Sequence, residues 1–341
     1  MKIIIPMAGM GKRMRPHTLT VPKPLIHVAG KAMVQRLAED IAIVCNEPIE
    51  EIAFIIGPLF GKDAEEMLKA VAANLGAIGT IWYQEEALGT AHAIMCAKEI
   101  LNGKVVVAFA DTLFKADFKM DATQEGIIWV QKIEDPRAFG VVKLDGQGII
   151  SDFIEKPAVF ISDLAIIGIY YFRDGKNLRE ELQYLLDNNI REKGEYQLTN
   201  ALENMKMKGV KFVPGTVTEW LDCGNVDATV FTNQRILEFN KNDNKLIAAS
   251  ILSENSEVVM PCFIGENVIL KNTKVGPHVS VGANTVVESS IISNSIIQKN
   301  SKIQNSKIQN SMIGSFVEIV GASGNFSIGD YTIINIQNEK L

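Results

Sequence analysis

The sequence is poor in the residue types that most often build metal centres and disulfide frameworks. Its 341 residues include four cysteines, four histidines and three tryptophans. The cysteines form no Cys-x-x-Cys pair and the histidines show no metal-ligand spacing, which argues against a zinc site. In a reducing compartment, Cys45, Cys96, Cys223 and Cys262 are expected to be free thiols or small core residues.

Long apolar runs and an excess of positive charge are also absent. No segment approaches the roughly 20 apolar residues that cross a bilayer, and Pro6 interrupts the first isoleucine run before it resembles a signal peptide. The formal net charge of -6 does not imply a nucleic-acid-binding surface. The length and a hydrophobic content of 47% suggest about two domains. We expect a cytoplasmic protein with no nucleic-acid or membrane partner.

Residues 1–235 alternate between short apolar runs and longer helix-like segments. Strands are predicted at residues 3–7, 52–56, 80–83, 105–110, 126–130 and 166–172. Helices are predicted at residues 34–44, 62–75, 90–99, 177–188 and 198–207. The alternation is typical of an α/β fold, Rossmann-like, with a mostly parallel mixed sheet and helices on both faces. Ligands of such sheets bind outside the carboxyl ends of the strands.

After residue 245 the pattern changes to aliphatic residues spaced five or six apart. They are Ile264, Leu270, Val275, Val281, Val287, Ile292, Ile297, Ile303, Ile308, Ile313 and Ile319. This spacing predicts a parallel β-helix of hexapeptide repeats, with the course of its turns left open by the five-residue gaps. Asn-Ser pairs begin at residues 294, 300, 305 and 310, and asparagine tolerates the left-handed conformation of tight corners. A low-complexity strand ladder is the alternative.

The most informative stretch is residues 9–24, Gly-Met-Gly-Lys-Arg-Met-Arg-Pro-His-Thr-Leu-Thr-Val-Pro-Lys-Pro, just after the first predicted strand. Gly9 and Gly11 let the backbone approach a ligand, and Arg13 and Lys23 supply positive charge. Glycine amides that point at phosphate oxygens, with cations that neutralise them, indicate a polyphosphate ligand. No Gly-Lys-Ser/Thr follows and a third glycine is missing, so the stretch is neither a P-loop nor a dinucleotide fingerprint.

The stretch resembles the signature of the sugar-1-phosphate nucleotidylyltransferases, roughly Gly-x-Gly-Thr-Arg-Leu/Met-x-Pro-x-Thr followed by Pro-Lys-Pro. Lys12 stands where the family most often has threonine. The resemblance implies that Arg13 and Lys23 are catalytic and that Gly9, Gly11 and Lys12 bind the nucleotide. The C-terminal repeats resemble the left-handed β-helix of long-type members. We therefore expect a catalytic domain at residues 1–235, a linker at 236–245 and a β-helix domain at 246–341.

A second segment of the chain resembles the base-recognition loop of the same family. Residues 84–93, Gln-Glu-Glu-Ala-Leu-Gly-Thr-Ala-His-Ala, follow a predicted strand and open a predicted helix. A glutamine amide can present both a donor and an acceptor to a pyrimidine edge. The resemblance implies that Gln84, Gly89 and Thr90 bind the nucleotide, whereas an ordinary strand-to-helix turn is the alternative.

Two aspartates are candidate metal ligands. Asp111 ends the apolar run that starts at residue 105, and Asp222 lies in Trp-Leu-Asp-Cys-Gly. Two carboxylates together with nucleotide phosphates are what an octahedral Mg²⁺ uses. By resemblance, Asp111 and Asp222 match the family's metal pair, although Ala110 replaces its usual glycine. Each aspartate taken alone is more often a cap or turn residue.

Three further segments resemble the family's sugar-binding motifs. They are Phe-Gly-Val-Val from residue 139, Glu-Lys-Pro from residue 155 and Ile-Ile-Gly-Ile-Tyr from residue 166. The resemblance implies that Gly140, Glu155, Lys156, Ile166 and Tyr170 bind the sugar phosphate. A carboxylate can accept hydrogen bonds from sugar hydroxyls, and a lysine can hold a phosphate as a point charge.

The resemblance implies Mg²⁺-dependent transfer of a nucleotidyl group from a nucleoside triphosphate to a sugar 1-phosphate, with release of pyrophosphate. Members specific for N-acetylglucosamine phosphate commonly carry asparagine at the position of Ile166, so glucose 1-phosphate and dTTP are favoured here. The alternatives are a UTP- or GTP-dependent enzyme, a bifunctional enzyme whose β-helix transfers an acetyl group with His278 as base, and a non-catalytic regulatory subunit. We also expect the β-helix to pack either against the catalytic domain or against another subunit, the latter in a homo-oligomer.

Overall fold

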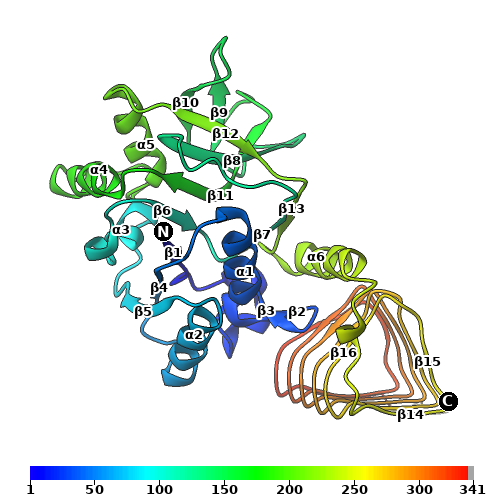
Figure 1. Ribbon diagram of the computed structural model, residues 1–341. Coiled ribbons are helices and arrows are strands. Elements are labelled where there is room, and N and C mark those ends of the chain that lie inside the picture. The colour runs from blue at the N-terminus through cyan, green and yellow to red at the C-terminus, as the bar shows by residue number, and fades with distance from the viewer. Residues whose placement is uncertain (337–341) are drawn as a thin grey trace. The chain divides into compact units, whose positions relative to one another are not determined.

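A computed structural model describes residues 1–336, and the chain divides into two compact units (Figure 1). The first unit comprises Met1–Gly9 and Val34–Trp220, and the second comprises Met10–Met33 together with Leu221 and the residues after it. Residues 10–24 of the glycine-rich stretch therefore belong to the second unit, whereas Gly9 belongs to the first. The predicted division into a catalytic domain (1–235), a linker (236–245) and a β-helix domain (246–341) remains a prediction.

The first unit is built on a nine-stranded sheet. Its main path is β10-β9-β11-β6-β1-β4-β5, and β8 pairs with β11 and β12. Strands β6, β1, β4 and β5 are parallel neighbours, whereas β11 is antiparallel to β6. The strands are β1 (Lys2–Pro6), β4 (Glu51–Ile56), β5 (Ile78–Tyr83), β6 (Val105–Ala108), β8 (Gly126–Lys132), β9 (Val141–Leu144), β10 (Ile150–Ile154), β11 (Leu164–Phe172) and β12 (Phe212–Thr216).

Helices cover both faces of this sheet. They are α1 (Met33–Cys45), α2 (Lys62–Asn74), α3 (Thr90–Met95), α4 (Gly175–Asp187) and α5 (Leu198–Met207). Because side chains alternate between the faces of a strand, Val105 and Val107 of β6 join the core formed with α3, α4 and α5. Val106 lies on the opposite face beside Ile41 and Val44 of α1. The predicted α/β fold with a mixed, Rossmann-like sheet is confirmed.

The six predicted strands and five predicted helices all form. The main difference is α3, which ends at Met95 and is followed by a 3-10 helix, Lys98–Ile100. The sequence reading missed the shorter strands β7 (Thr112–Lys115), β9, β10, β12 and β13 (Glu219–Asp222). These strands have four or five residues each, too few for a clear alternation. No helix in residues 1–336 is long and apolar enough to cross a membrane.

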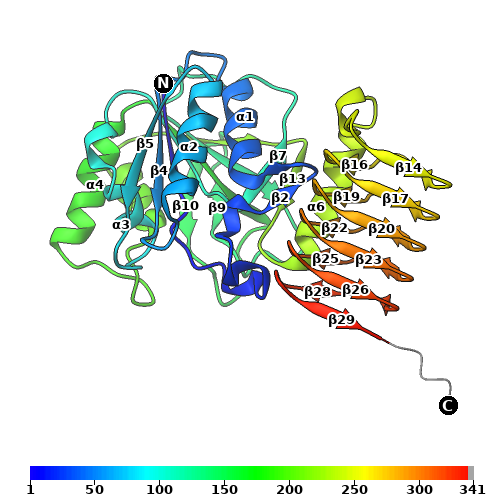
Figure 2. The ribbon, with the colours of Figure 1, turned by 90° about the horizontal axis from the view of Figure 1, so that it is seen from below.

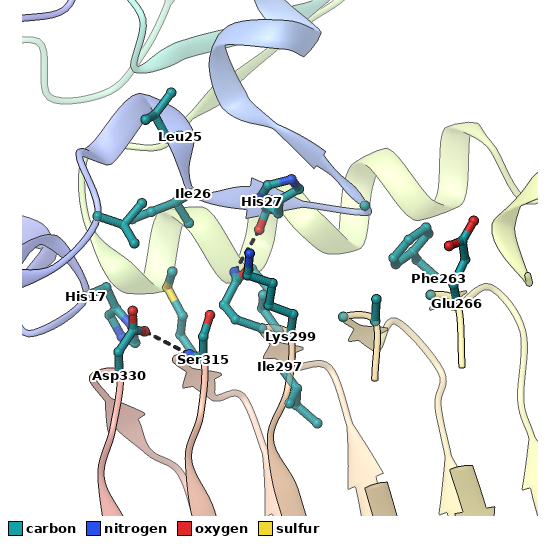
Figure 3. A pocket seen from close by; sticks show the side chains of 18 residues that line it. His17, Leu25, Ile26, His27, Phe263, Glu266, Ile297, Lys299, Ser315 and Asp330 are labelled. Atoms are coloured by element: carbon teal, nitrogen blue, oxygen red, sulfur yellow. Dashed lines mark hydrogen bonds between the residues drawn. The ribbon is translucent and has the colours of Figure 1, made fainter. Parts of the chain in front are cut away.

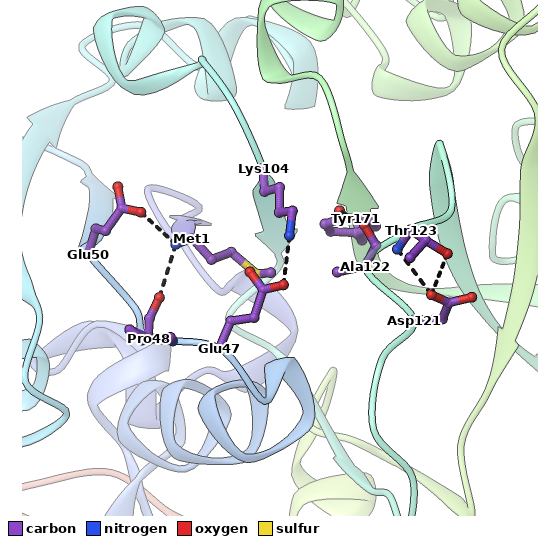
Figure 4. Close-up of polar contacts among 9 residues, drawn as sticks. All are labelled: Met1, Glu47, Pro48, Glu50, Lys104, Asp121, Ala122, Thr123 and Tyr171. Atoms are coloured by element: carbon purple, nitrogen blue, oxygen red, sulfur yellow. Dashed lines mark hydrogen bonds and ion pairs between the residues drawn. The ribbon is translucent and has the colours of Figure 1, made fainter.

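Polar contacts fix the amino ends of the central strands (Figure 4). The Met1 amino group donates to the Pro48 carbonyl at 3.0 Å and lies 2.9 Å from a Glu50 carboxylate oxygen. The Lys104 ammonium, just before β6, forms a 2.6 Å ion pair with Glu47. These contacts lie at the edge of the sheet opposite to the carboxyl ends, where ligands are expected.

The second unit contains helix α6 (Val226–Phe239) and a left-handed parallel β-helix, whose triangular coils are stacked in Figures 1 and 2. The coils form three parallel sheets of six, five and five strands. The first sheet contains β14 (Leu252–Glu254), β17 (Ile269–Lys271), β20 (Val286–Glu288), β23 (Lys302–Gln304), β26 (Glu318–Val320) and β29 (Ile333–Asn335).

The other two sheets carry the remaining sides of each coil. One contains β15 (Glu257–Val258), β18 (Lys274–Val275), β21 (Ile291–Ser293), β24 (Lys307–Gln309) and β27 (Ser323–Gly324). The other contains β16 (Phe263–Ile264), β19 (Ser280–Val281), β22 (Ile296–Ile297), β25 (Met312–Ile313) and β28 (Ser327–Ile328). A hairpin of β2 (His27–Val28) and β3 (Lys31–Ala32) also belongs to this unit.

The five-residue gaps in the repeat correspond to shorter sides of the triangle. Leu270 pairs with Val287, a coil of 17 residues, and Val287 pairs with Ile303, a coil of 16 residues. The aliphatic residues that predicted the repeat are 0–1% exposed and form one continuous core. A parallel β-helix thus accommodates coils of unequal length by shortening a side while its core positions stay in register.

Asparagines occupy the corners in the left-handed conformation, as predicted. Asn294, Asn300, Asn305 and Asn310 have φ between 40° and 60°. Side-chain amides also pair between coils: Asn267 donates to Asn284 at 3.1 Å, and Asn284 donates to Asn300 at 3.2 Å. Each corner asparagine in these ladders therefore finds a hydrogen-bond partner for its side-chain amide in the next coil.

Replacement of Asn284 separates these two contributions. Asn284→Ala loses both ladder hydrogen bonds and leaves a β-carbon at a φ of 57°, a conformation that costs roughly 1–2 kcal/mol. Asn284→Gly loses the same bonds without that strain. We expect the alanine variant to melt about 2–4 °C below the glycine variant in differential scanning calorimetry. Equal melting temperatures would contradict the role of the left-handed corner.

Candidate active site

Four predicted sugar-site residues of the first unit come together beside the β9–β10 hairpin. The Gly140 carbonyl accepts a hydrogen bond of 2.8 Å from the backbone amide of Ile166 in β11. A β-carbon at Gly140 would lie 3.2 Å from Glu155 Oε2 and 3.3 Å from Ile166 Cδ1. The Lys156 ammonium lies 3.5 Å from Glu155 Oε1. The result is a corner with one carboxylate, one ammonium and an aliphatic wall, which we call the sugar corner (Gly140, Glu155, Lys156 and Ile166).

The backbone of the sugar corner is strained at Lys156. Its φ of 41° is left-handed, although it precedes Pro157, which favours an extended conformation. The Lys156 amide donates to the Phe139 carbonyl at 3.2 Å, and the Lys193 ammonium donates to the Lys156 carbonyl at 3.2 Å. Such strain persists where surrounding contacts over-determine the conformation and is common at ligand sites. The Lys156 side chain is 52% exposed and lies beside the Glu155 carboxylate, whose side chain is 13% exposed.

Tyr170, the fifth predicted sugar residue, lies deeper in the sheet. It is 6% exposed, and burial raises its pKa, with the Glu155 carboxylate acting in the same direction. Its ring meets the edge of Phe109 with centroids 6.1 Å apart. Tyr170 therefore forms the floor near Glu155, and its aromatic packing gives it a structural role there.

The predicted base loop is held against the segment that precedes α5. A β-carbon at Gly89, whose φ is 111°, would lie 2.5 Å from the Tyr196 carbonyl oxygen, so only glycine fits there. Thr90 Oγ1 accepts from the Leu198 amide at 2.9 Å and donates to Gln197 at 3.3 Å. Gln84, 9% exposed, donates to the Gly89 carbonyl at 3.2 Å. Gly89 and Thr90 therefore shape the loop that positions Gln84.

Asp111 and Gly9 follow two neighbouring parallel strands of the same unit. Asp111 comes three residues after β6 and is half-buried, while Gly9 comes three residues after β1 and is exposed. A β-carbon at Gly9 would meet nothing within 4 Å. Packing in the described chain therefore does not require glycine at this position, and open space remains on that side of the backbone.

In the second unit, the glycine-rich segment folds into three short 3-10 helices, Lys12–Met14, His17–Leu19 and Lys23–Leu25. A β-carbon at Gly11, whose φ is 58°, would lie 2.9 Å from Thr18 Cγ2 and 3.0 Å from Lys23 Cβ. Thr18 also donates to the Gly11 carbonyl at 2.9 Å. Gly11 thus lets the turn close against the stem of Lys23, a lysine only 8% exposed. Lys12, at the start of the first of these helices, is exposed.

Arg13 and Asp222 also approach each other in the second unit. A β-carbon at Gly224 would lie 2.9 Å from Asp222 Oδ2 and 3.4 Å from an Arg13 guanidinium nitrogen. The Asp222 carboxylate accepts from the Gly224 amide at 3.1 Å. Met14, fully buried, receives a 3.5 Å contact from the Thr229 hydroxyl of α6. This packing anchors the cationic segment beside α6 and the carboxylate that ends β13.

The profile of the nucleotidyl transferase family matches residues 2–238. The chain belongs to this family. It is 30% identical to the low-salt glycan biosynthesis nucleotidyltransferase Agl11 of Haloferax volcanii, with 84% of this chain and 85% of that protein covered. It is 28% identical to a glucose-1-phosphate thymidylyltransferase of Streptomyces antibioticus, with 99% and 100% covered. Identity to the bifunctional protein GlmU of Methanococcus vannielii is 29%, with 85% and 78% covered.

Solved structures show the same fold in other nucleotidyl transferases. A UDP-glucose pyrophosphorylase complexed with UDP-glucose matches with a TM-score of 0.57 and 22% identity over 70% of this chain and 98% of that one. A putative glucose-1-phosphate thymidylyltransferase from Bacillus anthracis matches with a TM-score of 0.57 and 24% identity over 68% and 93%. The predicted relation to the sugar-1-phosphate nucleotidylyltransferases is confirmed.

Two polar residues of this nucleotidyl transferase were not predicted as site residues but touch the candidate site. Thr199 Oγ1 donates to Glu155 Oε2 at 3.4 Å, and His92 Nδ1 lies 3.2 Å from Gln84 Nε2. Thr199 is 44 residues from Glu155 in the sequence, so no local pattern links them. His92 lies eight residues after Gln84 and could have been found once α3 was predicted to start at Thr90.

The nucleotidyl transferase also has a cavity of about 350 Å³ within its second unit (Figure 3). It is bounded by residues 17–30 on one side and by the β-helix on the other, and aliphatic side chains such as Leu25, Ile26 and Ile297 form much of its wall. His17 lies at one end beside Asp330. The His17 ring is 3% exposed, its Nε2 is 3.1 Å from Ser327 Oγ, and its Nδ1 has no partner among residues 1–336.

His17 makes the stability of the protein depend on pH. Burial lowers the His17 pKa from 6.5 to about 4, although Asp330 opposes this. Below pH 6.5 the His17 ring is protonated in the unfolded state, whereas in the native state it stays neutral down to about pH 4. The free energy of unfolding therefore decreases as the pH falls towards 4. The shift corresponds to about 3 kcal/mol. We expect wild type to lose about this much more stability than His17→Gln between pH 7 and pH 4 in urea titrations; parallel curves would contradict the assignment.

Proposed function

We propose that this protein uses dTTP and glucose 1-phosphate, with Mg²⁺, to make a nucleotide sugar and pyrophosphate. The sugar corner is the observation that carries the proposal. Glu155 offers a carboxylate fixed by Thr199, Lys156 offers a cation 3.5 Å from that carboxylate, and Ile166 makes the adjoining wall apolar. A hydroxyl-bearing ring with a phosphate matches these groups, and the aliphatic wall provides no amide partner for an acetamido substituent.

The reaction needs little covalent chemistry from the protein. A phosphate oxygen of the sugar 1-phosphate attacks the α-phosphorus of the nucleotide in line, the new P–O bond forms, and the bond to the β-phosphate oxygen breaks. A phosphate monoester has a second pKa near 6, so the nucleophile is already anionic at pH 7. No general base is required, and rate enhancement comes from positioning and charge neutralisation.

The cationic segment of the second unit has the groups for this task. Arg13 would bind the β- and γ-phosphates, because its planar guanidinium matches phosphate oxygens and stabilises charge on the departing pyrophosphate. Lys23 would bind the α-phosphate and the incoming sugar phosphate. Lys23 is only 8% exposed, and the short 3-10 helix that it begins, Lys23–Leu25, holds its stem against Gly11.

Asp111 and Asp222 are the proposed Mg²⁺ ligands. Carboxylate oxygens suit this ion, which also keeps water and phosphate ligands. Mg²⁺ in nucleotide sites is held by one or two carboxylates together with substrate phosphates, so the triphosphate would supply further ligands. When bound, Mg²⁺ would neutralise phosphate charge and orient the triphosphate.

Acetyl transfer by the β-helix, with His278 as base, is the competing function. His278, the base that this function would need, has its Nε2 2.6 Å from the Glu238 carboxylate of α6, and its carbonyl accepts from Asn233 at 3.3 Å. These contacts give His278 a structural role between α6 and a coil corner. Incubation with acetyl-CoA and an amino-sugar phosphate tests this alternative directly.

Replacement of Lys23 tests the catalytic assignment. Lys23→Ala removes the charge that would stabilise the transition state, so we expect kcat to fall at least about a hundredfold while the far-UV circular dichroism spectrum is unchanged. Lys69→Ala, which removes an exposed lysine from α2, serves as the control and should retain full turnover. Near-normal turnover in Lys23→Ala would refute the assignment.

The substrate assignment is tested by a matrix of dTTP, UTP, GTP, CTP and ATP against glucose, mannose and N-acetylglucosamine 1-phosphates. Pyrophosphate release is followed with and without EDTA. We expect the highest kcat/KM for dTTP with glucose 1-phosphate and loss of activity with EDTA that Mg²⁺ restores. A higher value for another pair would replace the substrate proposal, and inactivity with every pair would favour a regulatory subunit.

A further inference from the structure

The side chain of Gln84 has both of its amide hydrogens engaged within the first unit. Its Nε2 donates to the Gly89 carbonyl at 3.2 Å and lies 3.2 Å from Nδ1 of His92 in α3. The Gln84 backbone is fixed as well, since its amide donates to the Ile56 carbonyl at 2.9 Å. A glutamine amide has two N–H donors, and these two contacts use both.

The Gly89 carbonyl determines which way the Gln84 amide faces. If the amide were reversed, its oxygen would stand opposite a carbonyl oxygen, and two acceptors repel each other. With Nε2 towards Gly89, the amide oxygen Oε1 is the group left for a ligand, and no described residue donates to it. Gln84 thus presents an acceptor, whereas the sequence alone left donor and acceptor equally available.

His92 completes this arrangement only in one protonation state. Its Nδ1 must carry a lone pair in order to accept from Gln84, so the neutral Nε2–H tautomer is required. Burial lowers the pKa of His92, Glu86 raises it and Arg191 lowers it. The Cys96 thiol, just after α3, donates to the His92 carbonyl at 3.3 Å. The surroundings therefore favour the neutral ring at pH 7.

We propose that His92 is a positioning residue that holds the Gln84 amide oxygen towards the nucleotide base and thereby selects bases with a ring N–H. Thymine and uracil carry a donor at N3 and guanine carries one at N1, whereas cytosine N3 and adenine N1 are acceptors. A buried acceptor facing an acceptor is left unpaired, which is costly. This inference rests on the proposed function, and it adds the device that sets the class of base.

The test compares three variants of the full chain in the pyrophosphate assay with glucose 1-phosphate. His92→Leu removes the acceptor, so Gln84 can rotate, and the ratio of kcat/KM for dTTP over dCTP should fall about tenfold. His92→Asn places an amide oxygen near the position of Nδ1 and should restore most of the ratio. Lys98→Ala, exposed in the next 3-10 helix, should leave the ratio unchanged.

A pH series gives a readout that a purely structural role would not move. Protonation of His92 converts Nδ1 into a donor, which opposes the Gln84 N–H, so KM for dTTP should rise in wild type as the pH falls from 7 to 5. His92→Asn has no such group and should show a smaller rise, since protonation of the substrate phosphates is common to both proteins.

The outcomes separate this inference from the function on which it rests. Wild type that is active and prefers dTTP, with the same ratio in His92→Leu, would overturn the role of His92 alone. A ratio that His92→Asn fails to restore, although His92→Leu lowers it, would also overturn it, because lost packing would explain both. Wild type that is inactive with every nucleotide would overturn both proposals.

Discussion

The architecture of the first unit depends on the full hydrogen bonding of β1. This strand pairs in parallel with β4 on one edge and with β6 on the other, and Ile3, Ile4 and Ile5 are fully buried on its two faces. When both edges of a strand are hydrogen-bonded and both faces are buried, residues that contact a ligand can only lie beyond the end of the strand. Gly9, Gln84 and Asp111 follow β1, β5 and β6, and because parallel strands run in one direction their carboxyl ends share one edge of the sheet.

The antiparallel part of the same sheet supplies the sugar corner. Strands β9 and β10 form a hairpin that places Gly140 and Glu155 near each other, and β11 brings Ile166 against them. The pairing of β11 with β8 shifts between Ile166 and Tyr170, and such irregularities often redirect side chains next to binding sites. In the proposed function, the parallel strands serve the nucleotide and the antiparallel strands serve the sugar phosphate.

Hydrophobic periodicity predicted the helices and strands well, because the buried face of each element requires apolar residues at a regular spacing within a short stretch of sequence. The strand at residues 52–56 and the helix at 198–207 follow directly from it. Contacts between distant segments could not be predicted in this way: Thr199 reaches Glu155 through the packing of α5 against β10, and the glycine-rich segment packs with the β-helix unit. The orientation of the Gln84 amide is similar, since it depends on the Gly89 carbonyl and on His92 together. These contacts and this orientation depend on how distant segments pack together, which the composition and the spacing of residues do not specify.

The unequal coils of the β-helix bear on how the length of this protein can change over evolution. A residue lost within a side would move every following side chain from the inside to the outside of the coil. A residue lost at a corner leaves the core in register, as the change from 17 to 16 residues per coil shows. Each coil contacts mainly its two neighbours, so the domain can gain or lose whole turns while its interior stays continuous. Length variation among relatives should therefore fall at corners or in steps of one coil.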